Sequence, residues 1–483
     1  MTQVSAQPLD APGRGLRNFT LQLASEMVAQ AIAFGLAIYL ARSLGAHGFG
    51  LWVFAATIIT YLAVVIDGGT ETWGMREVGA HPERLKQALI GVVRLRLALC
   101  AATLLVVGVA AIFVPREQSV ALLFGTSSLL VLVFNTNWAH RGLELAAPSL
   151  TTLIQRLIMV ALVVVMVRSP SDAVQVTLWQ GLSEGIAAVI LLAMLAGRLK
   201  AGREATDPPP HRRLFHEAWP LGISRALRNL ATAGGAVVLG FTSSTEDVGY
   251  FGAALRVATI LVLLSTIFNN AAFPSLTRAC KIGGKVEEQS IAAAARLLAI
   301  LVTPVVVGGL VLSAPIIHEL FSPAFGQAAL PLAILLCALF CMAHGDLMRR
   351  ILAARHHQRL DLKLTARATA LTMVAIVALT PFFATLGAAS AMLLGEFVLL
   401  ILAKRALAQT GPGISVVKAS AAPFVAALLM ATCVFLLSDY SVWVRLAAGA
   451  TIYSSLMWLD RARILDDLRT LAFLAKPAPS SKS

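Results

Sequence analysis

The stretch Tyr39–Glu77 reads YLARSLGAHGFGLWVFAATIITYLAVVIDGGTETWGMRE, and it decides the fold class. One apolar segment ends at Arg42, a glycine-rich turn around His47 follows, and a second apolar run continues to Asp67. Backbone polar groups at membrane depth must be hydrogen-bonded within helices or closed barrels. Two apolar segments joined by a tight turn therefore predict a helical hairpin that crosses a bilayer twice.

The composition extends this prediction to the whole chain. Of its 483 residues, 58% are hydrophobic and only 13% are charged, whereas soluble domains carry about 25% charged residues. Apolar runs of ~20 residues recur, each long enough to cross a hydrocarbon core of ~30 Å. The polar lead 1–16 lacks the apolar core and cleavage site of a removable signal peptide. We expect an all-α integral membrane protein that retains its first apolar helix.

About fourteen transmembrane helices are predicted from the apolar runs. Their approximate cores are Asn18–Ala41, Leu51–Gly74, Ala88–Val114, Ser119–Asn137, Pro148–Val167, Val174–Gly197, Trp219–Phe241, Tyr250–Leu276, Ile291–Ser313, Ala329–His344, Thr365–Ala384, Ala388–Leu407, Val417–Leu437 and Val442–Leu459.

A polar segment, Arg198–His216, divides the first twelve spans into two halves, because its three prolines, Pro208–Pro210, cannot continue a helix. Two halves of like orientation indicate a pseudo-two-fold axis along the membrane normal, with the substrate path between them. The predicted organisation is a cytoplasmic tail (1–16), an N-lobe (17–197), a cytoplasmic linker (198–216), a C-lobe (217–409), a C-terminal helix pair (410–460) and a cytoplasmic tail (461–483).

The basic residues predict the orientation, since cytoplasmic loops are rich in Lys and Arg. With the N-terminus inside, only five of the 39 Lys and Arg residues fall toward the outer side, which leaves 34 on or toward the inner side. These five are Arg42, Arg116, Arg168, Arg256 and Arg445. The net charge of +14 is therefore a topology signal and a contact for membrane lipids, and we expect no nucleic-acid partner.

The sequence carries no recognisable motif of an enzyme that makes or breaks covalent bonds. The sequence has no P-loop, no Gly-rich dinucleotide turn and no nucleophile elbow, and the outer loops are too short for a glycan-modifying site. Cys337 and Cys341 share a helix face, but no His or carboxylate is spaced to complete a metal site, so apolar packing is the favoured interpretation. We expect a protein that is not an enzyme and that uses no metal and no cofactor.

Acidic residues inside the spans are candidates for coupling, because a charge at the bilayer centre costs at least ~2.5–3.5 kcal/mol. Glu26 lies in the first span, and Glu184 and Glu396 lie near the middle of the sixth and twelfth spans, at corresponding places in the two halves. Asp67 and Glu71 end the second span. Two interpretations of Glu184 and Glu396 stay open: a protonatable or cation-binding pair facing a cavity, or hydrogen bonds that join neighbouring helices.

Arginines inside the spans are candidates for binding an anionic substrate. Arg225 and Arg228 share one face of the seventh span, and Arg256 is the basic residue in the outer half of the eighth. The alternative is that each side chain extends to the headgroups. Arg94 and Arg96 open the third span on its inner side.

The order of several short motifs resembles the polysaccharide-type lipid-linked oligosaccharide flippases, the O-antigen/polysaccharide transporters of the multidrug/oligosaccharidyl-lipid/polysaccharide exporter superfamily. The hairpin above is similar to their amino-terminal signature. Further similar motifs are Trp219–Gly222, Val248–Tyr250, which repeats the first hairpin turn about 200 residues later, Phe273–Leu276, and Leu386–Ala391 with Glu396. The resemblance runs from about Leu16 to Arg405.

The resemblance implies export of an undecaprenyl-diphosphate-linked glycan across the bacterial inner membrane by alternating access, with both termini cytoplasmic. Arg225, Arg228 and Arg256 would then bind the diphosphate, and Glu26, Glu184 and Glu396 would couple transport. The polysaccharide polymerase machinery is a further candidate partner. One departure is that family members often carry an acid midway along the seventh span, where this chain has Gly234-Gly235-Ala236.

Two other functions compete with this one. A drug/cation antiporter would share the architecture, but its cavity should be acidic and aromatic. A membrane-embedded glycosyltransferase or polymerase is disfavoured by the short outer loops.

Overall fold

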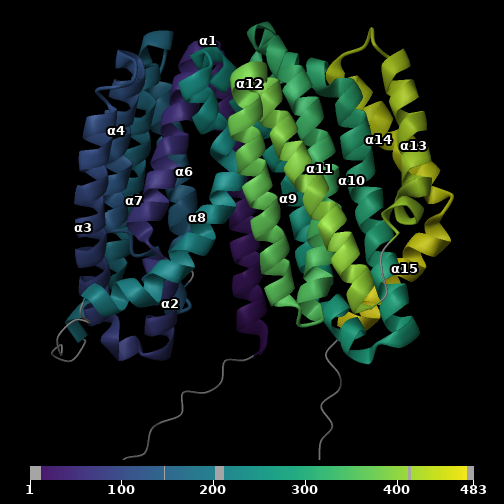
Figure 1. The fold of residues 1–483 in the computed structure, drawn as a ribbon, viewed down its shortest axis with the longest axis horizontal. Helices are drawn as coiled ribbons and strands as arrows, with labels where there is room; N and C mark the ends of the chain where they lie inside the picture. The colour runs from purple at the N-terminus through teal and green to yellow at the C-terminus, as the bar shows by residue number, and fades with distance from the viewer. Residues whose placement is uncertain (1–11, 146, 202–210, 412–414, 476–483) are drawn as a thin grey trace, which may run out of the picture. The chain divides into compact units, whose positions relative to one another are not determined.

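The computed structural model describes residues 12–145, 147–201, 211–411 and 415–475, and within these ranges it contains helices and no strand (Figure 1). The predicted all-α fold is confirmed. The helices are α1 (Pro12–Asp67), α2 (Thr70–Ala80), η1 (Pro82–Arg84), α3 (Leu85–Ala110), α4 (Arg116–Val133), α5 (Asn137–Gly142), α6 (Ala147–Met166), η2 (Pro170–Gln175), α7 (Val176–Ala201), α8 (His211–Thr242), α9 (Thr245–Ile282), α10 (Gly284–Phe321), η3 (Pro323–Ala328), α11 (Ala329–Ala354), α12 (Gln358–Thr410), α13 (Val416–Leu436), α14 (Val442–Trp458) and α15 (Arg461–Ala475).

The helices account for the predicted fourteen spans. Ten helices of the described chain are long and apolar enough to cross a membrane. Two of them hold two spans each, because α1 bends at Gly45 (φ 68°) and α12 bends at Ala384 (φ 46°). The remaining two spans are α8, which carries two arginines in its middle, and α14, whose 17 residues are near the lower limit for a crossing. The protein is a multi-pass membrane protein.

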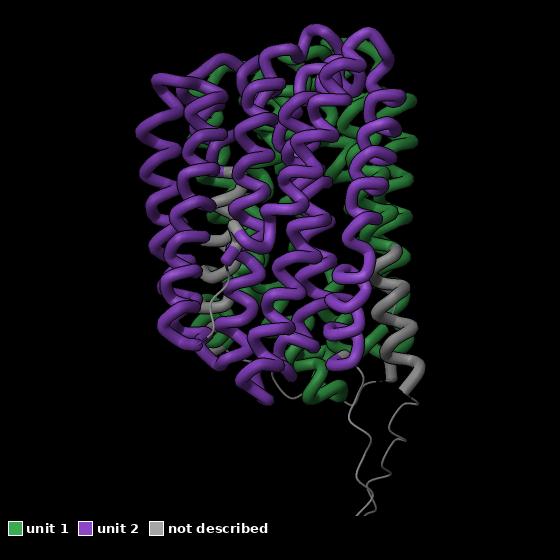
Figure 2. The backbone as a smooth tube through the Cα atoms, turned by 90° about the vertical axis from the view of Figure 1, so that its right-hand side faces the viewer, with its two compact units in different colours: residues 1–226 green, residues 227–483 purple. Residues whose placement is uncertain are grey.

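The chain forms two compact units, residues 1–226 (unit 1) and 227–483 (unit 2), whose border falls inside α8 (Figure 2). Helix α7 extends to Ala201 and α8 begins at His211, so helical structure enters the predicted 198–216 linker from both sides. The triple proline lies outside the described residues. The predicted lobe boundaries stay a prediction.

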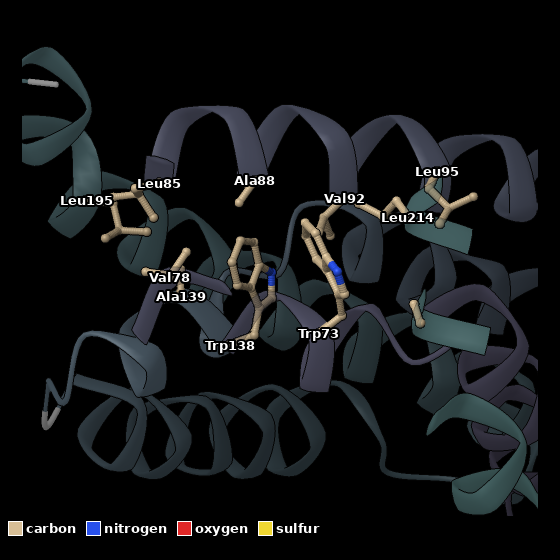
Figure 3. Close-up of a cluster of buried hydrophobic side chains, with 11 residues drawn as sticks. Trp73, Val78, Leu85, Ala88, Val92, Leu95, Trp138, Ala139, Leu195 and Leu214 are labelled. Carbon is tan, nitrogen blue, oxygen red and sulfur yellow. The ribbon is translucent and has the colours of Figure 1, made fainter. Parts of the chain in front are cut away.

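Two short helices that the hydropathy pattern did not indicate, α2 and α5, build the core at one end of unit 1. Trp73 of α2 and Trp138 of α5 are both buried and lie under Val92 and Ala88 of α3 (Figure 3). Gly74 of α2 faces the Trp138 ring so closely that a Cβ there would lie 2.4 Å from Trp138 Cε3. A small residue is therefore needed where α2 crosses α5.

The break between α1 and α2 needs glycine. Gly68 and Gly69 have φ of 50° and 85°, in the left-handed region that L side chains rarely adopt. A Cβ on Gly69 would lie 2.0 Å from the carbonyl oxygen of Ala218 in α8, and a Cβ on Gly222 would lie 2.7 Å from Gly68 C. The turn and α8 therefore touch through their backbones.

In unit 2, the repeated motif begins a helix. Ser244 caps α9, and its hydroxyl accepts from the backbone N–H of Asp247 while the Asp247 carboxylate accepts from the Ser244 backbone. The fully buried Phe251 follows, and its ring lies against Gly235 of α8. The acid expected midway along the seventh span is thus replaced by small residues that allow close helix packing.

The last helix, α15, occupies the segment predicted as a C-terminal tail, and it packs against α9 and α10. Asp467 of α15 forms an ion pair with Arg296 of α10. From α9, Ser275 Oγ donates to the Leu471 carbonyl at 2.9 Å and Arg278 Nη1 donates to the Leu474 carbonyl at 2.6 Å. Its fifteen residues are too few and too polar for the hydropathy pattern to identify.

Candidate substrate and coupling residues

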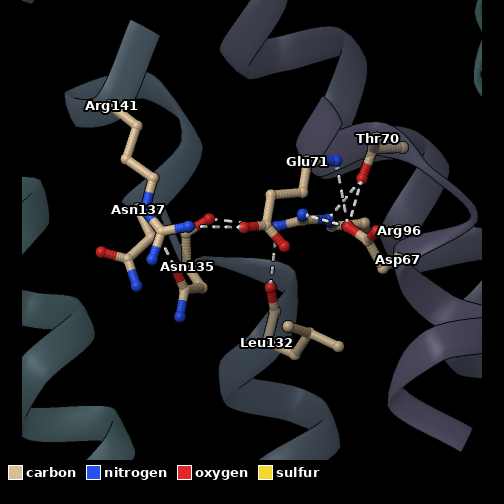
Figure 4. Close-up of polar contacts among 8 residues, drawn as sticks. All are labelled: Asp67, Thr70, Glu71, Arg96, Leu132, Asn135, Asn137 and Arg141. Carbon is tan, nitrogen blue, oxygen red and sulfur yellow. Dashed lines mark hydrogen bonds and ion pairs between the residues drawn. The ribbon is translucent and has the colours of Figure 1, made fainter. Parts of the chain in front are cut away.

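Arg96, which the sequence places at the inner end of the third span, has a hydrogen-bond acceptor for each of its three nitrogens. Its guanidinium donates from Nη2 to Asp67 Oδ1 at 2.6 Å and from Nε to Thr70 Oγ1 at 2.8 Å (Figure 4). Its Nη1 donates to the carbonyls of Leu132 and Asn135, at 3.1 and 3.0 Å. Arg96 is 2% exposed. One arginine thereby joins the end of α1, the start of α2, α3 and the end of α4.

Asp67 has a second role in the same network, because its Oδ1 also accepts from the backbone N–H of Glu71 at 3.1 Å in the first turn of α2. Glu71 in turn pairs with Arg141 of α5 at 3.5 Å. The charged and polar groups in this network are hydrogen-bonded or paired with one another. Such a network holds the helices that it joins in fixed positions, and we call it a structural clamp. Arg94, two residues before Arg96, is exposed.

Glu184 lies within α7 and is bonded by neutral donors. Gln180 Nε2, one turn earlier on the same helix, donates to Glu184 Oε1 at 3.1 Å, and Ser128 of α4 lies close enough to interact with the carboxylate. Glu184 therefore faces α4. Its predicted role in coupling stays a prediction, and the helix-joining alternative describes these contacts.

Arg156 of α6 is a charged residue inside a span that the sequence analysis overlooked. It is close enough to Glu184 to interact with it electrostatically. Its Nε is buried and has no hydrogen-bond partner among the described residues. The sequence did contain the signal, since Arg156 stands in the middle of the apolar run Pro148–Met166.

In unit 2, Glu396 lies in the second half of α12, one residue after Gly395. That glycine lets α12 fold back on itself closely, because a Cβ there would lie 1.8 Å from Thr372 Oγ1. Glu396 is half-buried and interacts electrostatically with Asp346 and Arg349 of α11.

Arg349 is the hub of these charges. Its Nε donates to Asp361 Oδ1 at 2.7 Å and its Nη1 donates to Asp346 Oδ1 at 3.0 Å. Three carboxylates and one arginine thus gather where α11 meets α12. The sequence marked Glu396 alone, because hydropathy cannot show which residues of the neighbouring helix lie beside it.

The remaining predicted residues lie on α1, α8 and α9. Glu26 is exposed on α1 and accepts from Gln30 Nε2 at 3.1 Å. Arg256 is half-buried near the beginning of α9. Arg225 and Arg228 lie in α8, but their side chains are outside the described part of the structure. The structure therefore does not test the proposed arginine path.

Metal-ligand groups of three or more His, Cys, Asp or Glu side chains are absent from the described ranges. Cys341 is buried and Cys337 is half-buried, and both are free thiols. The packing interpretation of this pair fits their burial.

Comparison with known proteins identifies the family. Residues 16–280 match the family described as polysaccharide biosynthesis protein. A candidate O-antigen transporter of Escherichia coli K12 is 22% identical over 371 residues, which cover 74% of this chain and 88% of that protein. A probable flippase of Haloferax volcanii is 26% identical over 229 residues, 45% of this chain and 48% of that protein.

Solved structures share the fold. The lipid II flippase MurJ in its inward closed conformation superposes with a TM-score of 0.76 at 12% identity, covering 92% of this chain and all of MurJ. An inward-facing multidrug resistance MATE transporter of the MOP superfamily gives 0.63 at 16% identity, covering 81% and 98%. Because the family match spans more than half of the chain, this protein belongs to the polysaccharide biosynthesis protein family.

Proposed function

We propose that this protein flips a lipid-diphosphate-linked oligosaccharide or polysaccharide precursor across the bacterial inner membrane by alternating access. The observation that carries the proposal is the combination of family and fold: a polysaccharide biosynthesis protein built as a multi-pass helical transporter. The named activities of the relatives agree, since one is described as an O-antigen transporter and two as flippases. The protein would act without covalent chemistry, as a transporter and not as an enzyme.

The substrate would be an undecaprenyl-diphosphate-linked glycan, in contact with membrane lipids and delivered to the polysaccharide polymerase machinery. The diphosphate carries negative charge through a low-dielectric core, where an unpaired charge costs several kcal/mol. Cations along the path offset this cost, and Arg binds phosphate oxygens through two parallel hydrogen bonds. Arg225, Arg228 and Arg256 are proposed for this role, with Glu26, Glu184 and Glu396 as coupling acids.

Flipping is tested by reconstituting the purified protein into vesicles with a labelled lipid-diphosphate glycan and measuring how much label becomes accessible on the opposite leaflet. We expect accessibility to rise only in vesicles that contain the protein. A rate equal to that of empty vesicles would contradict the proposed function.

The role of Arg228 has its own prediction. Arg228→Ala should abolish flipping in this assay, and Arg228→Lys should restore it only partly, because an ammonium lacks the two-pronged grip of a guanidinium. Wild-type flipping by Arg228→Ala would remove this residue from the mechanism and leave headgroup contact as its role.

The second candidate is a drug/cation antiporter, favoured by the fold likeness to MATE transporters. It is weaker because the family match and both sequence relatives concern polysaccharides or flippases. Efflux of cationic drugs from vesicles driven by a proton or sodium gradient, without glycan flipping, would favour it.

A further inference from the structure

Arg156 stands at the midpoint of a membrane span. It is the tenth of the 20 residues of α6, Ala147–Met166. A 20-residue helix is ~30 Å long, which is about the thickness of the hydrocarbon core. The backbone of Arg156 therefore lies at the level of the bilayer centre. Placing an arginine there costs at least ~2.5–3.5 kcal/mol of free energy.

Extension to the headgroups does not explain such a residue. An arginine near a helix end can reach the interface with its aliphatic stem, whereas one at the midpoint has about 15 Å of helix on either side. Arg156 is half-buried, and its Nε is enclosed. Part of the guanidinium, its Nε, is therefore enclosed by the protein.

The guanidinium has no anionic partner in contact. Among the described residues Arg156 forms no ion pair within 4.0 Å, and its Nε has no acceptor. Glu184 is the acid near enough to interact electrostatically, yet its carboxylate already accepts a hydrogen bond from Gln180. Unit 1 thus holds a mid-membrane arginine beside a carboxylate that it does not bind.

The contrast with Arg96 shows what is missing. Arg96, in the same unit, has acceptors for all three of its nitrogens and an aspartate at 2.6 Å. Its surroundings complete a clamp. Arg156 has a negative charge nearby, that of Glu184, which favours the charged form of its guanidinium. Its Nε–H has no acceptor in the described part of the chain, so it is free to donate a hydrogen bond to an oxyanion.

We propose that Arg156 is an anion-binding residue at mid-membrane in unit 1, and that it binds the diphosphate group of the transported lipid. The identity of the anion rests on the proposed function. The negative charge of Glu184 stabilises the nearby guanidinium charge without contact when no substrate is bound, and it repels the diphosphate when substrate is bound. This balance makes the site a transient one, as a transport path requires.

The proposal is tested on the purified full-length protein in lipid nanodiscs by titration with inorganic pyrophosphate and with undecaprenyl diphosphate. Arg156→Gln should weaken binding of both probes roughly 10- to 100-fold, as expected for the loss of hydrogen bonds between charged partners. Glu184→Gln should bind both at least as tightly as wild type, because a repelling carboxylate is gone.

Two further variants separate binding from structural effects. Arg168→Gln makes the same chemical change at an exposed position just beyond the end of α6, and it should bind like wild type. The double variant Arg156→Gln/Glu184→Gln leaves no lone buried charge, so it should fold, and it should bind as weakly as Arg156→Gln. Wild-type binding by the double variant would show that Arg156 serves only to balance Glu184, and would overturn the proposal.

Failure of the site and failure of the function give different results. If wild-type protein does not bind pyrophosphate, or if Arg156→Gln binds it unchanged, the site is wrong even when lipid-linked glycan is flipped. If binding depends on Arg156 but no glycan is flipped in vesicles, the anion site stands and the proposed substrate is wrong.

Discussion

Arg94 and Arg96 show how differently two arginines of one span can be used. Arg94 is exposed, whereas Arg96 is buried and donates to four acceptors, which come from the end of α1, the start of α2 and the end of α4. Burying a charge is costly unless it is paired and its hydrogen bonds are satisfied. Arg96 meets both conditions, so its main contribution is to fix the relative positions of α1, α2, α3 and α4.

Arg96→Gln should destabilise the protein strongly, by roughly 3–5 kcal/mol, because it leaves the Asp67 carboxylate buried without its partner. The measurement is the thermal unfolding midpoint of purified protein in detergent. Arg94→Gln is the matched control and should unfold close to wild type. Equal midpoints for the two variants would show that the clamp contributes little.

The coupling acids give a second prediction for single residues. Glu184→Gln and Glu396→Gln each keep the shape of the side chain but cannot bind and release a proton or pair with a cation. Each should impair flipping in vesicles while the amount of protein in the membrane stays at the wild-type level. If both variants flip normally, the coupling hypothesis is wrong and the interpretation as helix-joining hydrogen bonds stands.

Residues that pair across helices set the limit of what sequence shows. Asp67, Glu71 and Arg96 were each marked as intramembrane charges, but their pairing depends on how α1, α3 and α4 pack. The same holds for Glu396, whose neighbours Asp346 and Arg349 come from α11. Hydropathy gives the depth of a charge in the membrane, whereas its partners come from tertiary structure.

Among the elements, the spans were predictable because the bilayer demands long apolar helices. The elements that were missed are the short or amphipathic ones: α2, α5 and α15. Each is stabilised by specific contacts, such as Gly74 against Trp138, and not by an apolar run. The bends of α1 and α12, at Gly45 and Ala384, lie where the predicted spans were separated, after Ala41 and after Ala384.

Helix α15 offers a prediction at the scale of an element. Asp467 is 7% exposed at its side chain and pairs with Arg296, while the adjacent Asp466 is 74% exposed and only bridges Arg469 on its own helix. Asp467→Asn should therefore lower stability by about 1.5–3 kcal/mol, the worth of a hydrogen bond to a charged group.

Asp466→Asn makes the identical change one residue away, and exposed ion pairs contribute about 0–1 kcal/mol. Limited proteolysis at the C-terminus and thermal unfolding should distinguish the two variants, with faster cleavage of Asp467→Asn. Equal cleavage and unfolding of both would mean that α15 is held by its apolar contacts alone.

For the whole molecule, the orientation in the membrane remains a prediction from charge. An even number of spans puts both termini on one side, and the excess of Lys and Arg assigns that side to the cytoplasm.

Because α10 continues to Phe321, eight residues beyond the predicted end of that span, an outer reporter belongs after Ser322. A reporter after Pro210, between α7 and α8, tests the inner side. An enzyme reporter that is active only outside the cytoplasm should be active after Ser322 and inactive after Pro210. The same reporter state at both positions would contradict the topology.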